Sequence, residues 1–441
     1  MKHKSKKNKS ISTSSIIPKF SNDLITRTHI FYLIILSLLF KIMTIGSTIF
    51  IFNSYIDYFD IRRYVLKSVL LSNGQLPYFS FPYEYPILSV IPNILAVIPS
   101  VIFSNFILTF SMYQMLMIIF DVMTTICIYY IALKVYKKEK IAFISGIIYT
   151  LSLCVAYTCL TRFDSFPVFL MLFSIFLILY KDELSMSVNN GYFINAIGFF
   201  VKIFPIVALP FLILYESKFT DGILKDRLKL NIIIYTVLSL LLFIPFIILT
   251  GLDKTIKPYL FATGSSSISV YGNTLTYNIY SWLHDVFKLS IDSNSVSLVM
   301  TIIMGIIIIS LLGIAFKMKK ISELNLIQFI CVSLIAVIIF SRFHSPQYFM
   351  WITPFFAILV ADDIYKILVF FIVQFFAFIE FPIIFGKYYT NISYVSSIGS
   401  YEWYITLLFF TIEYIFIFIL LKMILSETIK YNINQYVQGE F

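Results

Sequence analysis

Charged residues are scarce in this sequence of 441 residues: they make up 13% of the chain, whereas hydrophobic residues make up 59%. A soluble domain carries roughly 25% charged residues, because water has to solvate its surface. The composition therefore excludes an ordinary soluble protein. It is typical of a chain whose surface faces hydrocarbon.

Cysteine is also rare, and none of the four cysteines belongs to a CxxC pair or has a histidine nearby. All four lie inside apolar runs, where a thiol acts as a small core side chain. The pattern predicts neither a disulfide framework nor a metal centre. The cysteines are Cys127, Cys154, Cys159 and Cys331.

Neither GxGxxG nor GxxxxGK[ST] occurs in the chain. Those loops hold nucleotide phosphates, so their absence disfavours a nucleotide or nucleotide-sugar substrate. The formal charge is +10, but the basic residues form short clusters between apolar runs. We therefore interpret the excess as a topology signal and expect no nucleic-acid partner.

Long apolar runs are abundant. A helix needs about 20 apolar residues to cross ~30 Å of hydrocarbon, and continuous rather than alternating runs favour helices over a barrel. We predict an all-α, polytopic transmembrane helical bundle with about ten spans. The predicted spans are 30–52, 106–133, 141–160, 165–180, 230–250, 296–316, 324–341, 347–360, 364–385 and 403–424.

The positive-inside rule sets the topology. Residues 1–29 form a basic tail that we expect to be cytoplasmic, followed by one transmembrane domain, 30–441. Prolines interrupt two apolar segments, 87–103 and 192–215, which we expect to enter and leave on one face. That topology places 22 Lys and Arg inside and 9 outside. The outer loops would then be 53–86, 161–164, 251–295, 342–346 and 386–402.

Two carboxylates, Asp57 and Asp60, follow the first predicted span. If this segment is helical, their spacing puts both on one face. Such a pair could bind a divalent metal, Mg²⁺ or Mn²⁺, or one carboxylate could act as a general base. The alternative is an ordinary interfacial pair hydrogen-bonded to Arg62 or Arg63, and spacing alone favours it.

A very short predicted outer turn holds Arg162 and Asp164. Taken alone, it favours a capping pair at a helix start. Lys202 lies among apolar residues beside Pro205. It either snorkels to the interface or lines a polar site where the helix breaks.

Another polar group, Arg342 and His344, lies at the outer end of two predicted spans. An arginine there suits bidentate phosphate binding. The histidine has a pKa suited to proton transfer, although a lone histidine is more often structural.

The order of these residues resembles the GT-C glycosyltransferases that use a polyprenyl-phosphate sugar. The similarity is to the archaeal and bacterial polyprenyl-phosphate-mannose-dependent mannosyltransferases and to the enzyme that adds the first mannose of GPI anchors. It covers about residues 45–360. The matching residues are Asp60, Tyr64, Gly74, Pro77, Tyr78, Tyr83, Glu84, Tyr85, Pro86, Arg162, Asp164, Lys202, Pro205, Pro346, Gln347, Tyr348 and Trp351.

This resemblance implies an inverting hexosyl- or mannosyltransferase in the cell membrane, or in the endoplasmic reticulum membrane of a eukaryote. Its donor would be a polyprenyl or dolichyl phosphate sugar, and its acceptor a glycolipid, a lipid-linked glycan or a protein. The implied base is Asp60, with Asp57 as second choice. The implied phosphate-binding residues are Arg162, Lys202 and Arg342, and the substrate-binding residues are Asp164, His344, Gln347, Tyr85 and Glu84.

The alternative is a secondary transporter or lipid flippase without covalent chemistry. Asp121, Glu380 and Glu413 lie within predicted spans, as the charges of an ion pathway do. Against it, the other polar residues gather in outer loops, and the two interrupted segments have no counterparts in a second half.

Overall fold

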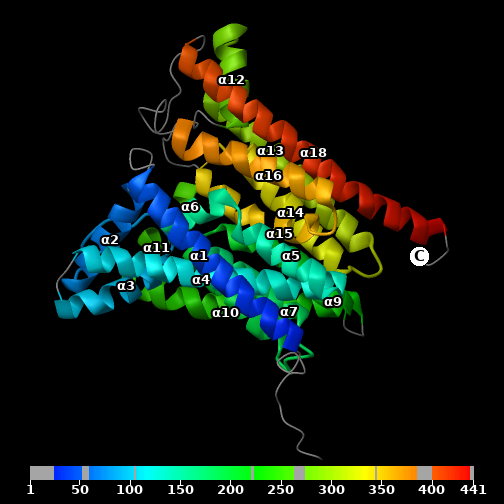
Figure 1. Cartoon of the computed structure of the whole chain (residues 1–441), viewed down its shortest axis with the longest axis horizontal. Helices are drawn as coiled ribbons and strands as arrows, with labels where there is room; N and C mark the ends of the chain where they lie inside the picture. The colour runs from blue at the N-terminus through cyan, green and yellow to red at the C-terminus, as the bar shows by residue number, and fades with distance from the viewer. Residues whose placement is uncertain are drawn as a thin grey trace, which may run out of the picture.

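The computed structural model describes residues 24–51, 59–103, 106–219, 223–262, 274–342, 345–384 and 400–437. These ranges contain helices but no β-strand, and one isolated bridge joins Pro77 and Phe81. Figure 1 shows most of the long helices running side by side as a bundle. The predicted all-α class is confirmed.

Seven helices of the described ranges are long and apolar enough to cross a membrane, which confirms a polytopic membrane bundle. Each covers one of the predicted spans. They are α1 (Leu24–Phe50), α4 (Phe106–Tyr136), α10 (Leu224–Thr250), α13 (Ser293–Lys317), α14 (Glu323–Phe340), α16 (Ile364–Phe378) with η7 (Ile379–Ile384), and α18 (Tyr401–Val437).

The three remaining predicted spans are shorter or bent. The range 141–160 is not one helix but two, α5 (Glu139–Thr150) and α6 (Leu153–Thr161), which meet at 55°. Helices α7 (Ser165–Leu179) and α15 (Phe349–Val360) have 15 and 12 residues. At 1.5 Å per residue they extend roughly 22 and 18 Å, less than the hydrocarbon thickness. Nearly all their side chains are buried, because both lie at the centre of the bundle.

The segment around Lys202 enters and leaves at the same end of the bundle. It consists of α8 (Val188–Val201), the short η4 (Phe204–Ala208) and α9 (Leu209–Phe219). Lys181, just beyond the end of α7, forms an ion pair with Glu216 near the end of α9. Both ends of the segment therefore lie close together, as the expected re-entrant course requires.

Lys202 forms the tip of this hairpin. Its backbone is extended, with φ −156° and ψ 145°, so α8 ends there. Pro205 follows and cannot continue a regular helix. The start of η4 packs closely against α8. A Cβ atom added to Gly198 would lie only 3.2 Å from the Cβ of Pro205.

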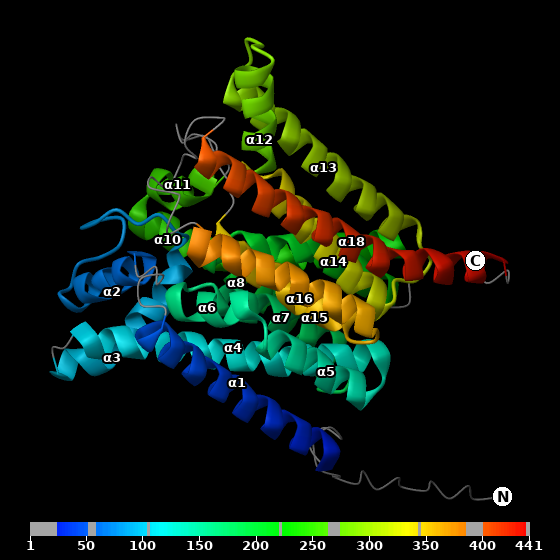
Figure 2. The ribbon, with the colours of Figure 1, turned by 45° about the horizontal axis from the view of Figure 1, so that its top comes forward.

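Helices α2 (Phe59–Ser72) and α3 (Val90–Phe103) pack against each other and against α4 at one end of the molecule (Figure 2). The short η3 (Ile87–Ser89) contacts α8 and α3. The expected entry and exit of 87–103 on one face of the membrane stays a prediction. Three further short helices belong to the predicted outer loop 251–295. They are α11 (Leu252–Ala262), α12 (Leu275–Ser281) and η5 (Trp282–Val286).

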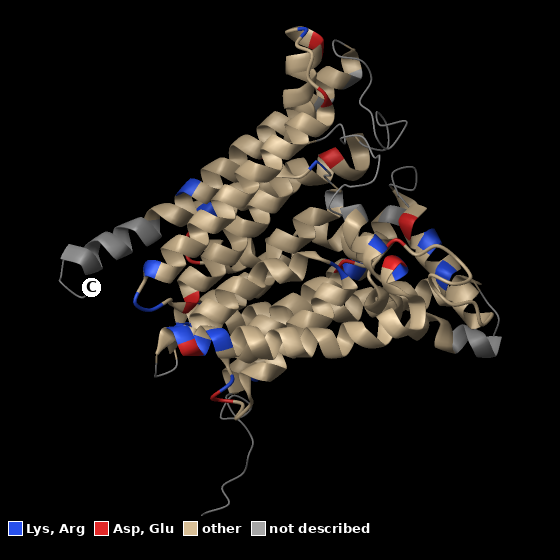
Figure 3. Ribbon diagram, turned by 180° about the vertical axis from the view of Figure 1, so that it is seen from behind, with Lys and Arg blue, Asp and Glu red and all other residues tan. Residues whose placement is uncertain are grey.

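Charged residues gather toward the ends of the bundle and are sparse along the middles of the helices (Figure 3). One exception is Lys41 on α1, whose Nζ lies 2.6 Å from Oδ2 of Asp121 on α4. Both side chains are completely buried. The hydroxyl of Tyr149 donates to the other carboxylate oxygen at 2.8 Å. Asp121 therefore faces the bundle interior, as predicted.

Candidate active site

Asp60 and Arg162 meet although 102 positions of sequence separate them. Nε of Arg162 lies 3.0 Å from Oδ2 of Asp60, which belongs to the first turn of α2. Arg162 ends α6 in an extended conformation, and its Nη1 donates to the carbonyl of Thr161 at 3.0 Å. The guanidinium is buried, whereas 24% of the Asp60 side chain stays exposed. Asp60 thus pairs with a distant arginine rather than with Arg62 or Arg63.

Asp164 occupies the N-cap position of α7 but makes no capping hydrogen bond, so the capping interpretation was wrong. Its Oδ1 instead lies 2.6 Å from Nζ of Lys202 and accepts from Nε1 of Trp351 at 2.7 Å. Asp164 is fully buried, and among the described residues its Oδ2 has no hydrogen-bond partner. A buried carboxylate oxygen normally has a hydrogen-bond partner, so we expect a water molecule or a substrate hydroxyl there.

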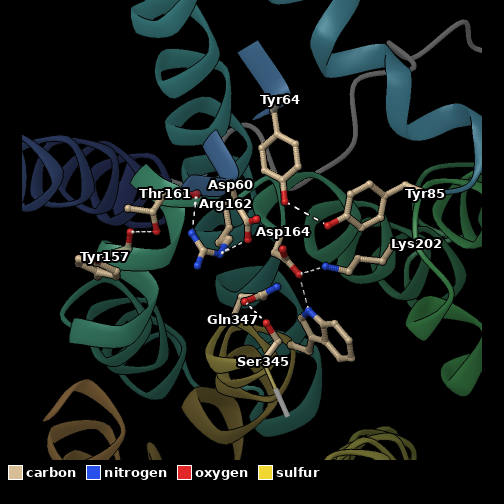
Figure 4. A network of polar contacts seen from close by, with 11 residues as sticks. Asp60, Tyr64, Tyr85, Tyr157, Thr161, Arg162, Asp164, Lys202, Ser345 and Gln347 are labelled. Atoms are coloured by element: carbon tan, nitrogen blue, oxygen red, sulfur yellow. Dashed lines mark hydrogen bonds and ion pairs between the residues drawn. The ribbon is translucent and has the colours of Figure 1, made fainter. Parts of the chain in front are cut away.

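Three aromatic rings lie near the amine of Lys202, and Figure 4 labels one of them, Tyr85. Nζ of Lys202 lies 4.7 Å from the ring centroid of Phe163, 5.3 Å from that of Trp351 and 5.8 Å from that of Tyr85. The negative faces of such rings stabilise a cation at low exposure. The sequence-based choice between snorkelling and a polar site is therefore settled: Lys202 lies in a polar site.

Two tyrosines cover the other side of the cluster. The hydroxyls of Tyr64 and Tyr85 lie 3.2 Å apart, and both rings pack edge-on against Phe163. Burial raises the pKa of both phenols well above the ordinary value. Both hydroxyls therefore stay protonated and able to donate at physiological pH.

Glu84 joins two cations of α2. Its Oε1 lies 3.1 Å from Nη2 of Arg63, and its Oε2 lies 2.6 Å from Nζ of Lys67. Burial lowers the pKa of Lys67, and the hydrogen bond to Glu84 opposes that shift. Sequence reasoning missed Lys67. The available signal was its position seven residues after Asp60, on the same helix face.

The segment between α14 and α15 contributes Gln347, which lies in η6 (Pro346–Tyr348) and accepts a hydrogen bond from Ser345. In Figure 4, Gln347 lies near Asp164 and Arg162. Arg342 precedes it on this segment, and burial lowers the pKa of its guanidinium. Two other predicted residues, Asp57 and His344, lie outside the described residues.

The described residues contain no group of three or more His, Cys, Asp or Glu that could hold a metal ion. Asp60 is in contact with Arg162, so a cation already faces one oxygen of that carboxylate. The expected Mg²⁺ or Mn²⁺ stays a prediction, because its second proposed ligand is Asp57.

The cluster lies inside the bundle, near the helix ends that the predicted topology places on the outer side. Gln114 of α4 donates to the carbonyl of Leu160, close to Arg162, at 2.9 Å. Gln114 is eight residues into α4, which corresponds to a depth of roughly 12 Å at 1.5 Å per residue. A partly exposed carboxylate therefore adjoins a buried arginine and a lysine within the outer part of the bundle, an arrangement suited to proton removal beside an anionic group.

No protein-family profile matches the chain, and no curated protein matches it in sequence. Among solved structures, it is similar to the archaeal oligosaccharyltransferase AglB from Archaeoglobus fulgidus in complex with an inhibitory peptide and a dolichol-phosphate. The TM-score is 0.42 at 13% identity, covering 91% of this chain and 56% of that chain. The chain thus spans little more than half of that neighbour, and a likeness at this TM-score assigns neither a family nor an activity.

Proposed function

We propose that this chain is a GT-C-type membrane glycosyltransferase that moves a hexose, specifically mannose, from a polyprenyl or dolichyl phosphate to a hydroxyl group. The acceptor would be a glycolipid, a lipid-linked glycan or a protein at the outer or luminal face. The observation that carries the proposal is the convergence of Asp60, Arg162, Asp164 and Lys202 at one end of the bundle.

Asp60 is the proposed general base. It would take the proton of the acceptor hydroxyl while that oxygen bonds to C1 of the donor sugar and the bond from C1 to the phosphate oxygen breaks. Attack opposite the departing phosphate inverts the configuration at C1. The contact with Arg162 engages Oδ2 and orients the carboxylate, and the exposed part of Asp60 is where an acceptor could reach it.

Arg162 and Lys202 are the proposed ligands of the departing phosphate. That group gains negative charge in the transition state, so donors that are already fixed in place stabilise it without reorganisation. Asp164 and the surrounding rings hold Lys202, and α6 and Asp60 hold Arg162. We propose Arg342, on the segment that carries Gln347, as a third ligand.

The remaining predicted residues have proposed roles in substrate binding. Asp164 would accept a sugar hydroxyl through Oδ2, and Gln347 and Tyr85 would donate to donor or acceptor oxygens. A lipid-linked donor is consistent with a polar cluster roughly 12 Å below the outer end of α4.

One observation favours a transporter as the second candidate. Lys41, Asp121, Glu380 and Glu413 are buried inside membrane-spanning helices, and such charges often serve ion pathways. Lys41 and Asp121 are, however, in direct contact with each other, and the cluster of partly exposed polar residues lies at the outer end instead.

The test is sugar transfer by the Asp60→Asn variant in native-like membranes supplied with labelled polyprenyl-phosphate mannose. We expect the rate to fall by about 10²–10⁴-fold, because the general base is lost. Asp362→Asn, a substitution at the opposite end of the bundle, should transfer normally. Equal insertion and melting temperature of the variants would show that both fold. Unchanged transfer by Asp60→Asn would remove Asp60 from the mechanism, and solute uptake without transfer would favour the transporter.

A further inference from the structure

A second group of polar side chains extends outward from Asp60 along α2. Asp60, Arg63, Tyr64 and Lys67 are spaced i, i+3, i+4 and i+7, which places them on one face of the helix. Glu84 of the following loop spans this face by contacting Arg63 and Lys67. The proposed base is therefore the inner end of a continuous polar row.

Exposure differs among the side chains of this row. The exposed fractions are 0% for Asp164, 12% for Lys202 and 24% for Asp60. Lys67 is 9% exposed, whereas Glu84 and Arg63 reach 30% and 49%. A half-exposed guanidinium is stable in water but not in lipid, so Arg63 faces the aqueous side. A water-soluble portion of an acceptor can approach Asp60 from that side.

The two ends of the row also differ in charge. At the inner end, Arg162 and Lys202 are each paired with one acid, Asp60 and Asp164. At the outer end, one carboxylate, Glu84, faces two cations. The outer end therefore carries one surplus positive charge, and it lies where an acceptor would arrive. A negatively charged group on the acceptor is attracted there.

Aromatic rings accompany these charges. The guanidinium of Arg63 lies 5.4 Å from the ring centroid of Phe59, which is half exposed. The amine of Lys67 lies 4.9 and 5.5 Å from the ring centroids of Tyr83 and Tyr85. Flat rings beside side chains that accept and donate hydrogen bonds suit a sugar, which presents an apolar face and equatorial hydroxyls.

We infer that Arg63, Lys67 and Glu84 form the acceptor subsite, and that the acceptor is a carbohydrate carrying a negatively charged group. This rests on the proposed transferase function. Arg63 and Lys67 lie roughly 4.5 and 10 Å from Asp60 along the axis of α2. The charged group thus lies within about two sugar rings of the reacting hydroxyl.

The first experiment identifies the charge of the acceptor. Cells lacking the chain should accumulate it, so their lipid and glycan extract is separated on an anion exchanger at neutral pH. Each fraction is then offered to the purified full chain with labelled polyprenyl-phosphate mannose. We expect label to enter material from the retained fraction. Transfer confined to the unretained, neutral fraction would overturn the inference.

The second experiment measures KM and kcat for the retained fraction with the Arg63→Gln variant. We expect the acceptor KM to rise by about 10–100-fold, because the variant removes a hydrogen bond between charged groups. The donor KM and kcat should stay within about twofold. Arg63→Lys keeps the charge and should recover part of the loss. Arg62→Gln, one residue earlier on the same helix, is the matched control.

Different failures have different meanings. If the wild-type chain transfers sugar but Arg63→Gln keeps the wild-type acceptor KM, the subsite is wrong and the transferase stands. If the wild-type chain transfers sugar to no fraction, the proposed function fails and the inference with it. Arg63 is the decisive position, because a half-exposed side chain can be changed without disturbing the fold.

Discussion

Two lysine–aspartate pairs in this molecule have the same length but different surroundings. Lys41 and Asp121 lie 2.6 Å apart in the middle of the bundle, as do Lys202 and Asp164 at its outer end. In the first pair both side chains are fully enclosed, and Tyr149 donates to the second oxygen of Asp121. In the second pair, part of Lys202 is exposed, and Oδ2 of Asp164 has no partner among the described residues.

The difference separates a structural ion pair from a site. In the closed pair neither side chain is accessible to a ligand, so its role is to join α1 to α4. In the open pair, the partly exposed amine-bearing side chain of Lys202 is within reach of a substrate. The distance between two charges therefore says little about function, and the exposure of the two side chains says more.

The largest effect is expected from a substitution that breaks the closed pair of Lys41 and Asp121. Lys41→Met leaves Asp121 buried without its cation, and we expect a loss of about 3–5 kcal/mol in stability. Thermal unfolding in detergent measures it. Replacing both partners, Lys41→Met with Asp121→Leu, should restore most of the loss. The control is Lys134→Met, whose partner Glu183 is 36% exposed, with an expected change of about 0–1 kcal/mol. If the Lys41→Met variant were as stable as the wild type, the pair of Lys41 and Asp121 would have no structural role.

Lys202→Met breaks the open pair, and here the expected effect is on rate. Loss of one fixed donor to the departing phosphate should lower kcat by about 10²–10³-fold. Lys254→Met, on α11, serves as the control for removal of an outer lysine. Single-turnover transfer of labelled sugar measures both. If Lys202→Met lost stability but kept kcat, Lys202 would have a structural role, as Lys41 does, and no role in catalysis.

The smallest effect tests how firmly Asp164 is held. Trp351→Phe removes the indole donor to Oδ1 but keeps a ring that can stack on Phe204, whose centroid lies 4.1 Å from that of Trp351. We expect about a tenfold fall in kcat, the cost of one hydrogen bond to a charged acceptor. Trp282→Phe, at a half-exposed tryptophan, should be neutral. Equal rates for the two variants would show that Lys202 alone fixes Asp164.

The hydropathy of the chain predicted the spans well, because burial in lipid demands long apolar runs whatever the tertiary contacts are. It also predicted the break at Lys202, since a lysine beside a proline interrupts any apolar helix. The bend between α5 and α6 was not predictable in this way. Thr150, Leu151 and Ser152 include neither glycine nor proline. The hydroxyl of Ser152 donates to the carbonyl of Ile148 at 2.8 Å, a hydrogen bond that often bends helices.

Pairing in the candidate site was predictable only in outline. Sequence order suggested that Asp60, Arg162 and Lys202 share one end of the bundle, and the structure brings them together. Sequence order could not show that Asp164, rather than Asp60, contacts Lys202. Lys67 was missed because a lysine in a loop looks solvated until Glu84 and the tyrosine rings are placed around it.

The hairpin of α8 and α9 has a consequence for how the protein is assembled. Both of its ends stay on the side where Lys181 contacts Glu216, so the amine of Lys202 reaches the opposite half of the bilayer without its flanking chain being exported. The counter-charge of Lys202 is Asp164, at the start of α7. Because α7 precedes α8 and α9 in the chain, this partner is synthesised before the lysine that needs it.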